Sequence, residues 1–238
     1  MKSPFSTTVL TLYPEAFPGV LGVSVIGRAL AQKKWQLETL DIRSFSDMKH
    51  ASVDDTTAGG GPGMVLRPDV AAMAIDSVTR DSRPLIHLSP RGKPLTQARV
   101  HELANGPGMV LFCSRFEGLD QRVIEARDME EISIGDYVLA GGEVAAQVLI
   151  EACVRLIPGV LGALASIEEE SFEQGLLEHP QYTRPRVWEE KQIPKVLLSG
   201  DHQRIARWRR DAATDLTKRV RPDLMDRLAK QESDDEHH

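Results

Sequence analysis

Short apolar runs alternate with segments of helical periodicity along the first 157 residues of the chain. Continuous or alternating apolar positions predict strands over residues 7–13, 35–42, 84–89, 108–114 and 131–134. Between these runs, apolar residues recur at three- and four-residue spacing and predict helices over 20–32, 70–78, 96–104, 119–127 and 143–157. Strands that alternate with helices predict the α/β class, with a mainly parallel sheet and helices on both of its faces.

The pattern changes after Pro158, because residues 162–200 are rich in glycine, proline and charged side chains. Two helical patterns follow, one over 201–219 with Asp201 as its N-cap and one over 222–230 with Pro222 at its start. We therefore predict an α/β domain, a flexible linker, a small helical domain and a disordered tail, over residues 1–161, 162–172, 173–230 and 231–238 respectively.

The length of 238 residues suits one large domain or a medium domain with a small one attached. No apolar run reaches the roughly 20 residues that span a membrane, and the N-terminus lacks the pattern of a signal peptide. Cys113 and Cys153 are far apart in the sequence and match no zinc-binding or redox spacing. These features predict a reduced, cytoplasmic protein that does not bind membranes.

Basic residues are concentrated near the C-terminus, although the whole chain carries a net charge of −6. Residues 184–230 contain 13 Lys and Arg against 7 Asp and Glu, whereas residues 1–183 contain 16 against 24. This asymmetry is typical of a protein with a polyanionic partner, but a pair of solvated helices would show it as well. Trp208 is predicted to anchor the core of the small domain, and the arginines beside it are candidates for phosphate contacts: Arg207, Arg209 and Arg210.

Three polar, glycine-bearing loops follow consecutive predicted strands, at residues 87–94, 113–120 and 133–143. Ligands of open parallel sheets bind at the carboxyl ends of the strands, so the loops predict a shared small-molecule site. Spacing alone leaves open the simpler interpretation that they are ordinary turns. The most glycine-dense stretch, AGGGPGM at 58–64, lacks the Lys-Ser/Thr pair of a P-loop, and no GxGxxG motif follows the first strand.

Two charged residues are candidates for chemistry. Glu170 lies in the acidic stretch SIEEESFEQG, where Ser166 and Glu169 fit a helix-capping box. Glu170 fits no cap and could act as a general base. Arg155 comes late in a helical pattern, where it could complement the helix dipole or stabilise a developing negative charge. Spacing alone does not decide between these roles.

Seven motifs occur in order along the chain: VDDTTAGGGPGM, LSPRGKPL, RFEGLDQRV, SIGDYVLAGGE, RLIPGVLG, GLLEHPQYTRP and LLSGDHQRIARWR. Together they resemble the bacterial tRNA (guanine-N1)-methyltransferases, which modify the guanine at position 37, beside the anticodon. The resemblance covers about residues 7 to 228. It implies a SPOUT-type α/β fold whose C-terminal part forms a deep trefoil knot. It also implies a homodimer whose active sites are shared between subunits.

The resemblance further implies that the loops after the strands bind S-adenosylmethionine, with its adenosine against residues 134–139. Gly141 and Gly142 would shape the turn there, and Glu178 would lie near the partner's cofactor. The full set of implied cofactor-binding residues is His87, Leu88, Ser89, Pro90, Ser114, Phe116, Glu117, Gly118, Ser133, Ile134, Gly135, Asp136, Tyr137, Val138, Leu139, Gly141, Gly142 and Glu178. The implied tRNA-binding residues are Gly60, Gly61, Arg184, Lys195, Arg207 and Arg209.

The family's catalytic base, an acid in the linker, aligns with Glu170, and a family arginine aligns with Arg155. We expect Arg155 to stabilise charge on guanine O6 while Glu170 removes the N1 proton, because a carboxylate of pKa about 4.3 is a weak base without such help. N1 then attacks the sulfonium methyl. The sequence shows no ligand cluster for a tightly held metal, so any magnesium, which the family uses, is expected to bind transiently.

Several positions depart from the family's usual pattern. Glu170 replaces the usual Asp, which keeps the carboxylate but adds one methylene. His87 and Phe116 stand where Tyr is usual, and Glu178 stands where Asp is usual. Two alternatives to the implied function are a knotted methyltransferase for another RNA target, such as a ribose 2′-hydroxyl, and a catalytically silent RNA-binding module.

Overall fold

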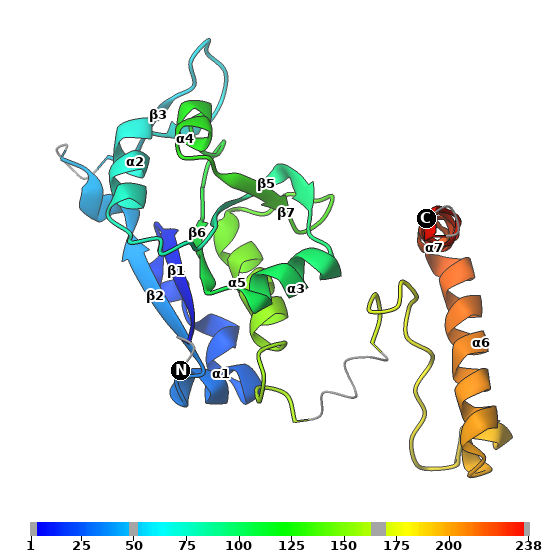
Figure 1. Ribbon diagram of the computed structural model, residues 1–238. Helices are drawn as coiled ribbons and strands as arrows, with labels where there is room; N and C mark the ends of the chain where they lie inside the picture. Colours follow the sequence, from blue (N-terminus) through cyan, green and yellow to red (C-terminus); the bar gives the residue numbers. More distant parts are fainter. Residues whose placement is uncertain (1–3, 48–51, 163–169, 236–238) are drawn as a thin grey trace. The chain divides into compact units, whose positions relative to one another are not determined.

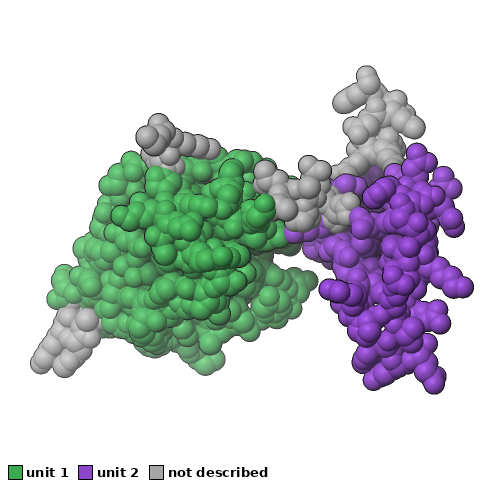
Figure 2. Space-filling view, turned by 90° about the horizontal axis from the view of Figure 1, so that it is seen from below, with its two compact units in different colours: residues 1–162 green, residues 163–238 purple. Residues whose placement is uncertain are grey.

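The computed structural model describes residues 4–47, 52–162 and 170–235. The chain divides into two compact units, residues 1–162 and residues 163–238, which Figure 2 shows in different colours. The boundary lies beside the predicted one at residue 161. Most of the predicted linker, together with the predicted capping box of Ser166 and Glu169, lies outside the described residues.

The first unit is built on a five-stranded parallel sheet with the strand order β2-β1-β6-β5-β7. Its strands are β1 (Phe5–Thr11), β2 (Trp35–Asp41), β5 (Leu85–Pro94), β6 (Gly108–Phe112) and β7 (Glu130–Ser133). All five coincide with predicted strands, and the pairing is parallel as the alternation of strands and helices predicts.

Helices cover both faces of this sheet (Figure 1). One core contains side chains of α1 (Ser24–Ala31), α3 (Gln97–Asn105) and α5 (Gly142–Val154), and the other contains side chains of α2 (Pro68–Asp76) and α4 (Gln121–Ala126). Successive strand residues point to opposite faces, so Val9 belongs to the first core and Leu10 to the second. The predicted α/β class is thereby confirmed.

The helix predicted over 20–32 is interrupted near its start. A 3-10 turn, η2 (Gly19–Gly22), precedes α1, and Ser24, the first residue of α1, has a φ of 54°. The two segments pack tightly, because a Cβ at Gly27 would lie 2.1 Å from the carbonyl oxygen of Gly22. A continuous helix would not bring these two glycines so close together. The periodicity of apolar residues therefore predicts the helix but not the break near its start.

The loop predicted over 87–94 is largely strand. β5 continues to Pro94, but its register with β7 shifts between Leu88 and Lys93. Residues 89–92 therefore bulge out of the pairing at the carboxyl end of the sheet. Gly92 permits the bulge to lie against β7, since a Cβ there would meet the backbone of Glu131 at 2.4 Å.

A short hairpin that the hydrophobic pattern does not reveal projects from the first unit. Its strands are β3 (Asp54–Thr56) and β4 (Met64–Leu66), and the glycine-dense stretch joins them. Two further 3-10 segments among the described residues of this unit are η1 (Pro14–Ala16) and η3 (Ile42–Phe45). The pairing of the strands does not test the predicted trefoil knot, which stays a prediction.

The described part of the second unit contains two helices, α6 (His202–Val220) and α7 (Pro222–Asp235). It also contains a small hairpin of β8 (Val187–Trp188) and β9 (Lys191–Gln192), and η6 (Lys195–Leu198). Asp201 caps α6 by accepting a 3.1 Å hydrogen bond from the Arg204 amide, as predicted. α7 continues through residues 231–235, which were predicted to belong to a disordered tail. No glycine or proline follows Lys230 to stop the helix. Residues 236–238 lie outside the described residues.

Candidate functional site

A cavity of about 310 Å³ lies where β5, β6 and β7 end. The three loops predicted to share a site line it together. Its lining comprises His87, Leu88, Ser89, Pro90, Arg91, Ser114, Arg115, Phe116, Glu117, Gly118, Ile132, Ser133, Ile134, Gly135, Tyr137, Val138, Leu139, Ala140, Gly141, Gly142 and Ala145. The volume is at the lower end of the roughly 300–1,000 Å³ typical of ligand pockets.

The loop between β7 and α5 is shaped by close contacts at its glycines. A Cβ at Gly141 would lie 2.2 Å from Nε of Arg115, and one at Gly142 would lie 2.8 Å from Cα of Cys113. The Gly142 amide donates a 3.1 Å hydrogen bond to the Ser114 carbonyl. Gly141 and Gly142 therefore leave room for the segment that contains Cys113 and Arg115. Sequence alone does not identify this steric requirement.

Arg115 fixes this loop to the start of α5. Its Nη2 lies 2.9 Å from Oε2 of Glu143, and its Nη1 donates a 3.3 Å hydrogen bond to the Ala140 carbonyl. Glu143 is only 3% exposed and accepts a 2.7 Å hydrogen bond from the hydroxyl of Thr11, at the end of β1. The Arg115 guanidinium also lies 4.4 Å from the ring centre of Tyr13. Arg115 and the start of α5 line this side of the cavity, and contacts with Glu143, Thr11 and Tyr13 hold them in place.

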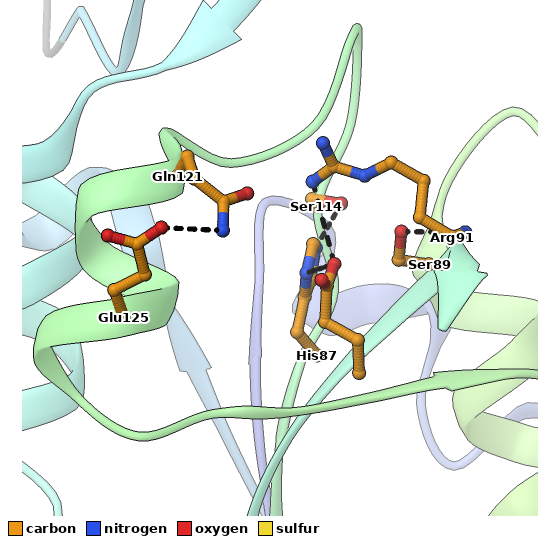
Figure 3. A network of polar contacts seen from close by, with 7 residues as sticks. His87, Ser89, Arg91, Ser114, Gln121 and Glu125 are labelled. Atoms are coloured by element: carbon orange, nitrogen blue, oxygen red, sulfur yellow. Dashed lines mark hydrogen bonds and ion pairs between the residues drawn. The ribbon is translucent and has the colours of Figure 1, made fainter. Parts of the chain in front are cut away.

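A buried polar network forms another wall (Figure 3). His87 on β5 is 1% exposed, and its Nε2 lies 2.9 Å from Oγ of Ser114. Its Nδ1 lies 3.2 Å from Oε1 of Glu131 on β7, which also lies 3.5 Å from Nη2 of Arg91. Burial lowers the pKa of His87 and outweighs the nearby Glu131 carboxylate, which raises it.

The cavity includes most of the residues that the resemblance implies for the cofactor. All of them line it except Asp136, which lies between two lining residues, and Glu178, which belongs to the second unit. Five further lining residues were not predicted from the sequence, and these are Arg91, Arg115, Ile132, Ala140 and Ala145. The first four lie inside a quoted motif or a predicted strand and Ala145 lies in a predicted helix, so adjacency to predicted residues was the only signal that could have identified them.

Gly60 and Gly61 lie at the exposed tip of the β3–β4 hairpin. Their φ values of 81° and 115° fall in the range that favours glycine, and no atom lies within 4 Å of a Cβ built on Gly60. The base of the hairpin is fixed beside the cavity, because the Glu117 amide donates to the Met64 carbonyl and the Leu66 amide donates to the Gly118 carbonyl. Neither glycine lines the cavity itself.

A second cavity, of about 250 Å³, lies entirely within the second unit. Glu170 lines it together with Gln174, Leu176, Leu177, His179, Ala206, Arg209 and Arg210. The structure thus brings together the predicted base and one predicted tRNA-binding residue, Arg209. Arg184, Lys195 and Arg207 are exposed elsewhere in this unit. Arg155 is the C-cap of α5 and lines neither cavity.

Trp208 is partly buried and packs against two other aromatic rings. Its centroid lies 6.2 Å from that of His179 and 6.1 Å from that of Tyr182. The predicted anchoring role of Trp208 is confirmed in this sense, since the ring joins α6 to the extended segment before the hairpin. This contact also positions His179 at the second cavity.

The first cavity suits S-adenosylmethionine in its chemistry. Leu88, Ile134 and Leu139 offer an apolar surface to a purine, and the serine hydroxyls and Glu117 offer partners for ribose hydroxyls and an ammonium group. No cluster of three or more His, Cys, Asp or Glu that could hold a metal occurs among the described residues. Within the same residues, no helix is long and apolar enough to cross a membrane.

Known proteins resemble almost the whole chain. A family model described as tRNA (Guanine-1)-methyltransferase TrmD matches residues 5–227. A protein from Caulobacter vibrioides named tRNA (guanine-N(1)-)-methyltransferase is 61% identical over 97% of this chain and 95% of its own length. Proteins of the same name from Rhodopseudomonas palustris and Mesorhizobium japonicum are 62% and 61% identical, each over 93% of this chain and over 89% and 96% of their own lengths.

Proposed function

The chain belongs to the tRNA (guanine-1)-methyltransferase TrmD family, and we propose that it transfers a methyl group from S-adenosylmethionine to N1 of the guanine at position 37 of tRNA. The observation that carries this proposal is the single cavity formed by the three strand-end loops, which gathers nearly all of the implied cofactor residues. When bound, S-adenosylmethionine supplies an electrophilic methyl group on a sulfonium sulfur.

We assign the proton transfer to Glu170. Its carboxylate shares a cavity with Arg209 and Arg210, so a tRNA group that enters meets guanidinium donors beside the base. Guanine N1 is a weak acid, and a carboxylate needs help to remove its proton. We assign this help to Arg155, which would stabilise the negative charge on O6 as the proton leaves.

We further propose that two copies of the chain form a homodimer with shared active sites. An apolar surface supports the pairing, because Val20, Val23, Val144 and Val148 are between 44% and 62% exposed. Val20 lies on η2 and Val23 directly follows it, while Val144 and Val148 lie on α5, whose Gln147 donates a 2.9 Å hydrogen bond to the Ala16 carbonyl of η1. Exposed apolar surface of this kind marks interaction sites.

We place the enzyme in the cytoplasm, where tRNA is modified and thiols stay reduced. Both cysteines are free, and burial raises the pKa of Cys153 to about 12. A thiol with such a pKa is protonated at neutral pH, which is consistent with a structural role. Transient magnesium binding stays a prediction without support from the described residues.

The test is methyl transfer to unmodified tRNA transcripts that carry G or A at position 37. Wild-type protein should methylate the G transcript only, and Glu170→Ala should lower the rate by about 10²- to 10⁴-fold, the usual contribution of a general base. Glu170→Asp is the matched control, because it restores a carboxylate in the form usual for the family. Its activity should exceed that of Glu170→Ala.

The alternatives give different results in the same assay. Methylation of a ribose 2′-hydroxyl, seen by nucleoside analysis, would favour a different RNA target. Binding of tRNA without any methyl transfer by wild type would favour a silent binding module. Full activity of Glu170→Ala would show that another residue is the base, and Glu169 would be the next residue to change.

Shared active sites can be tested by mixing two inactive variants. If Glu170 and Arg155 of one site come from different subunits, a mixture of Glu170→Ala and Arg155→Ala dimers regains activity after subunit exchange, because one site of each mixed dimer is intact. If both residues come from the same subunit, every site carries one defect and the mixture stays inactive.

A further inference from the structure

Three polar side chains from three parts of the sheet form a chain of contacts at the cofactor cavity. Ser114 follows β6, His87 lies within β5 and Glu131 lies within β7. The distance from Ser114 Oγ to His87 Nε2 is 2.9 Å, and the distance from His87 Nδ1 to Glu131 Oε1 is 3.2 Å. Figure 3 shows the imidazole of His87 directed toward Ser114. His87 and Ser114 both line the cavity, and Ser114 is 9% exposed.

The two contacts of His87 determine where its proton lies. An ionised carboxylate only accepts hydrogen bonds, so the contact with Glu131 requires the proton on Nδ1. In the neutral imidazole, Nε2 is then an acceptor, and the hydroxyl of Ser114 must donate to it. This uses the single proton of Ser114, so its oxygen presents only lone pairs to the cavity.

We propose that His87 is a positioning residue that fixes Ser114 Oγ as a hydrogen-bond acceptor, and that a hydroxyl or amino group of the cofactor donates to it. This inference rests on the proposed function, because it assigns a partner for one polar group of S-adenosylmethionine. His87 acts through Ser114, although the resemblance implies that it contacts the cofactor directly. The position is one at which the chain departs from the tyrosine usual in the family.

The arrangement makes cofactor binding sensitive to pH. In the protonated imidazole both nitrogens donate, so Nε2 would donate to Ser114 and turn the hydroxyl proton of Ser114 into the cavity. The charged groups that face His87 are Glu131 from β7 and Arg91 from the bulge of β5, while Phe112 on β6 and Ser114 are neutral. Burial lowers the pKa of His87, so the acceptor state is the one present at neutral pH.

Serine, histidine and a carboxylate in this order also form the triad of nucleophilic hydrolases. The two interpretations differ in what Ser114 does. A positioning role requires only a hydrogen bond from the bound cofactor, whereas a nucleophilic role requires attack on an acyl or phosphoryl group. An organophosphate probe separates the two, because it labels an activated serine. Labelling of Ser114 would contradict the positioning role.

The main experiment measures the affinity of S-adenosylmethionine by calorimetry from about pH 5.5 to about pH 8, the range in which histidines titrate. Wild-type affinity should fall toward the acidic end. Ser114→Ala and His87→Phe should bind about three- to tenfold more weakly at neutral pH, as expected for one lost hydrogen bond. His87→Phe should also lose the pH dependence.

Two further variants keep the result interpretable. His87→Gln supplies an amide that can donate to Glu131 and accept from Ser114 without titrating, so its affinity should not change across this pH range. Ser89→Ala removes another cavity hydroxyl, one whose hydrogen bond comes from the Arg91 amide at 3.2 Å, so this variant should keep the wild-type pH dependence. A wild-type pH dependence that persists in His87→Gln and His87→Phe would overturn the proposal.

A spectroscopic measurement tests the proton position without any substitution. Nitrogen NMR of histidine-labelled wild-type protein should show His87 with its proton on Nδ1 at neutral pH. A proton on Nε2 would overturn the proposal even if the variants fail to fold. Absence of S-adenosylmethionine binding by wild type would instead contradict the proposed function, so the two failures can be told apart.

Discussion

The two compact units differ in how their side chains are buried. In residues 1–162, both faces of a sheet bury large apolar side chains, among them Trp35, Met109 and Phe112, each of which is fully buried. In the described part of residues 163–238, the buried side chains are His179, Ala213, Thr217 and Leu224. A small apolar core stabilises a domain weakly, so we expect the second unit to open more readily than the first.

The two cavities also differ in how firmly the residues that line them are held. The first cavity is lined by loops at the ends of paired strands, and its Gly141 and Gly142 lie tightly against Arg115 and Cys113. The cavity of the second unit is lined by long side chains of α6 and by the segment that begins at Glu170. If the first cavity holds the cofactor and Glu170 is the base, as we propose, the cofactor site is preorganised, whereas the segment with the base can adjust to a large substrate.

The largest effect on this comparison is expected from Glu143→Ala. The carboxylate of Glu143 is buried against Arg115 and Thr11, and breaking a buried ion pair costs about 3–5 kcal/mol of unfolding free energy. Hydrogen exchange measured by mass spectrometry should increase in peptides of residues 1–162 and stay unchanged in α6. The matched control is Glu151→Ala, an exposed position of the same helix, which should change stability by less than about 0.5 kcal/mol.

A smaller effect, confined to the second unit, is expected from Thr217→Val. Thr217 Oγ1 accepts a 2.9 Å hydrogen bond from the Leu177 amide and donates a 2.8 Å one to the Ala213 carbonyl. Leaving a buried amide unsatisfied costs about 1–3 kcal/mol. Exchange should increase in α6 and in residues 176–182, with no change in cofactor affinity. Thr214→Val is the control on the same helix, and equal effects of both variants would contradict this account.

The pH dependence of the unfolding free energy should contain a contribution from His87 that is absent in His87→Gln. Burial puts its folded pKa below the ordinary value of about 6.5, so the unfolded chain takes up the proton first as pH falls. The contribution of His87 to the unfolding free energy is therefore fully present above about pH 6.5. It decreases below that pH, by at most about 1.4 kcal/mol per pH unit. Denaturant titrations should show a smaller decrease for His87→Gln than for wild type. An identical decrease in both would mean that His87 is not buried in its neutral form.

The smallest effect is expected from single charges on the surface. Arg207→Gln should weaken tRNA binding and lower the salt dependence of log K by about one counterion, if this exposed arginine meets a phosphate. Arg28→Gln makes the same charge change at an exposed position of the first unit and should leave the slope unchanged. Equal slopes for both variants would show that tRNA contacts are not concentrated in the second unit.

Much of the first unit could be predicted from its sequence, since continuous apolar runs at 84–89 and 108–114 leave few alternatives to buried strands. The register shift between Leu88 and Lys93 could not, because it depends on which strand lies beside β5. For the same reason the pattern did not single out Arg91, which the bulge brings to the cavity.

Candidate residues of the site were predictable only where motifs carried them. The His87–Ser114–Glu131 network joins side chains that lie 27 and 44 residues from His87 in sequence, and spacing gives no sign of their contact. In the second unit, Asp201 and Pro222 were sufficient to mark the helix starts, because capping is a local interaction. The cavity around Glu170 depends on packing between distant segments and could not be predicted from local signals.

The strand order has a consequence for synthesis on the ribosome. β5 is made before both of the strands that flank it, β6 and β7. Until these emerge, the nascent chain presents an apolar strand with both edges open, which is the kind of segment that pairs with other chains. Elongation proceeds at about 5–20 residues per second, so this exposure lasts for seconds. Residues 85–94 are therefore where we expect chaperones to bind the growing chain.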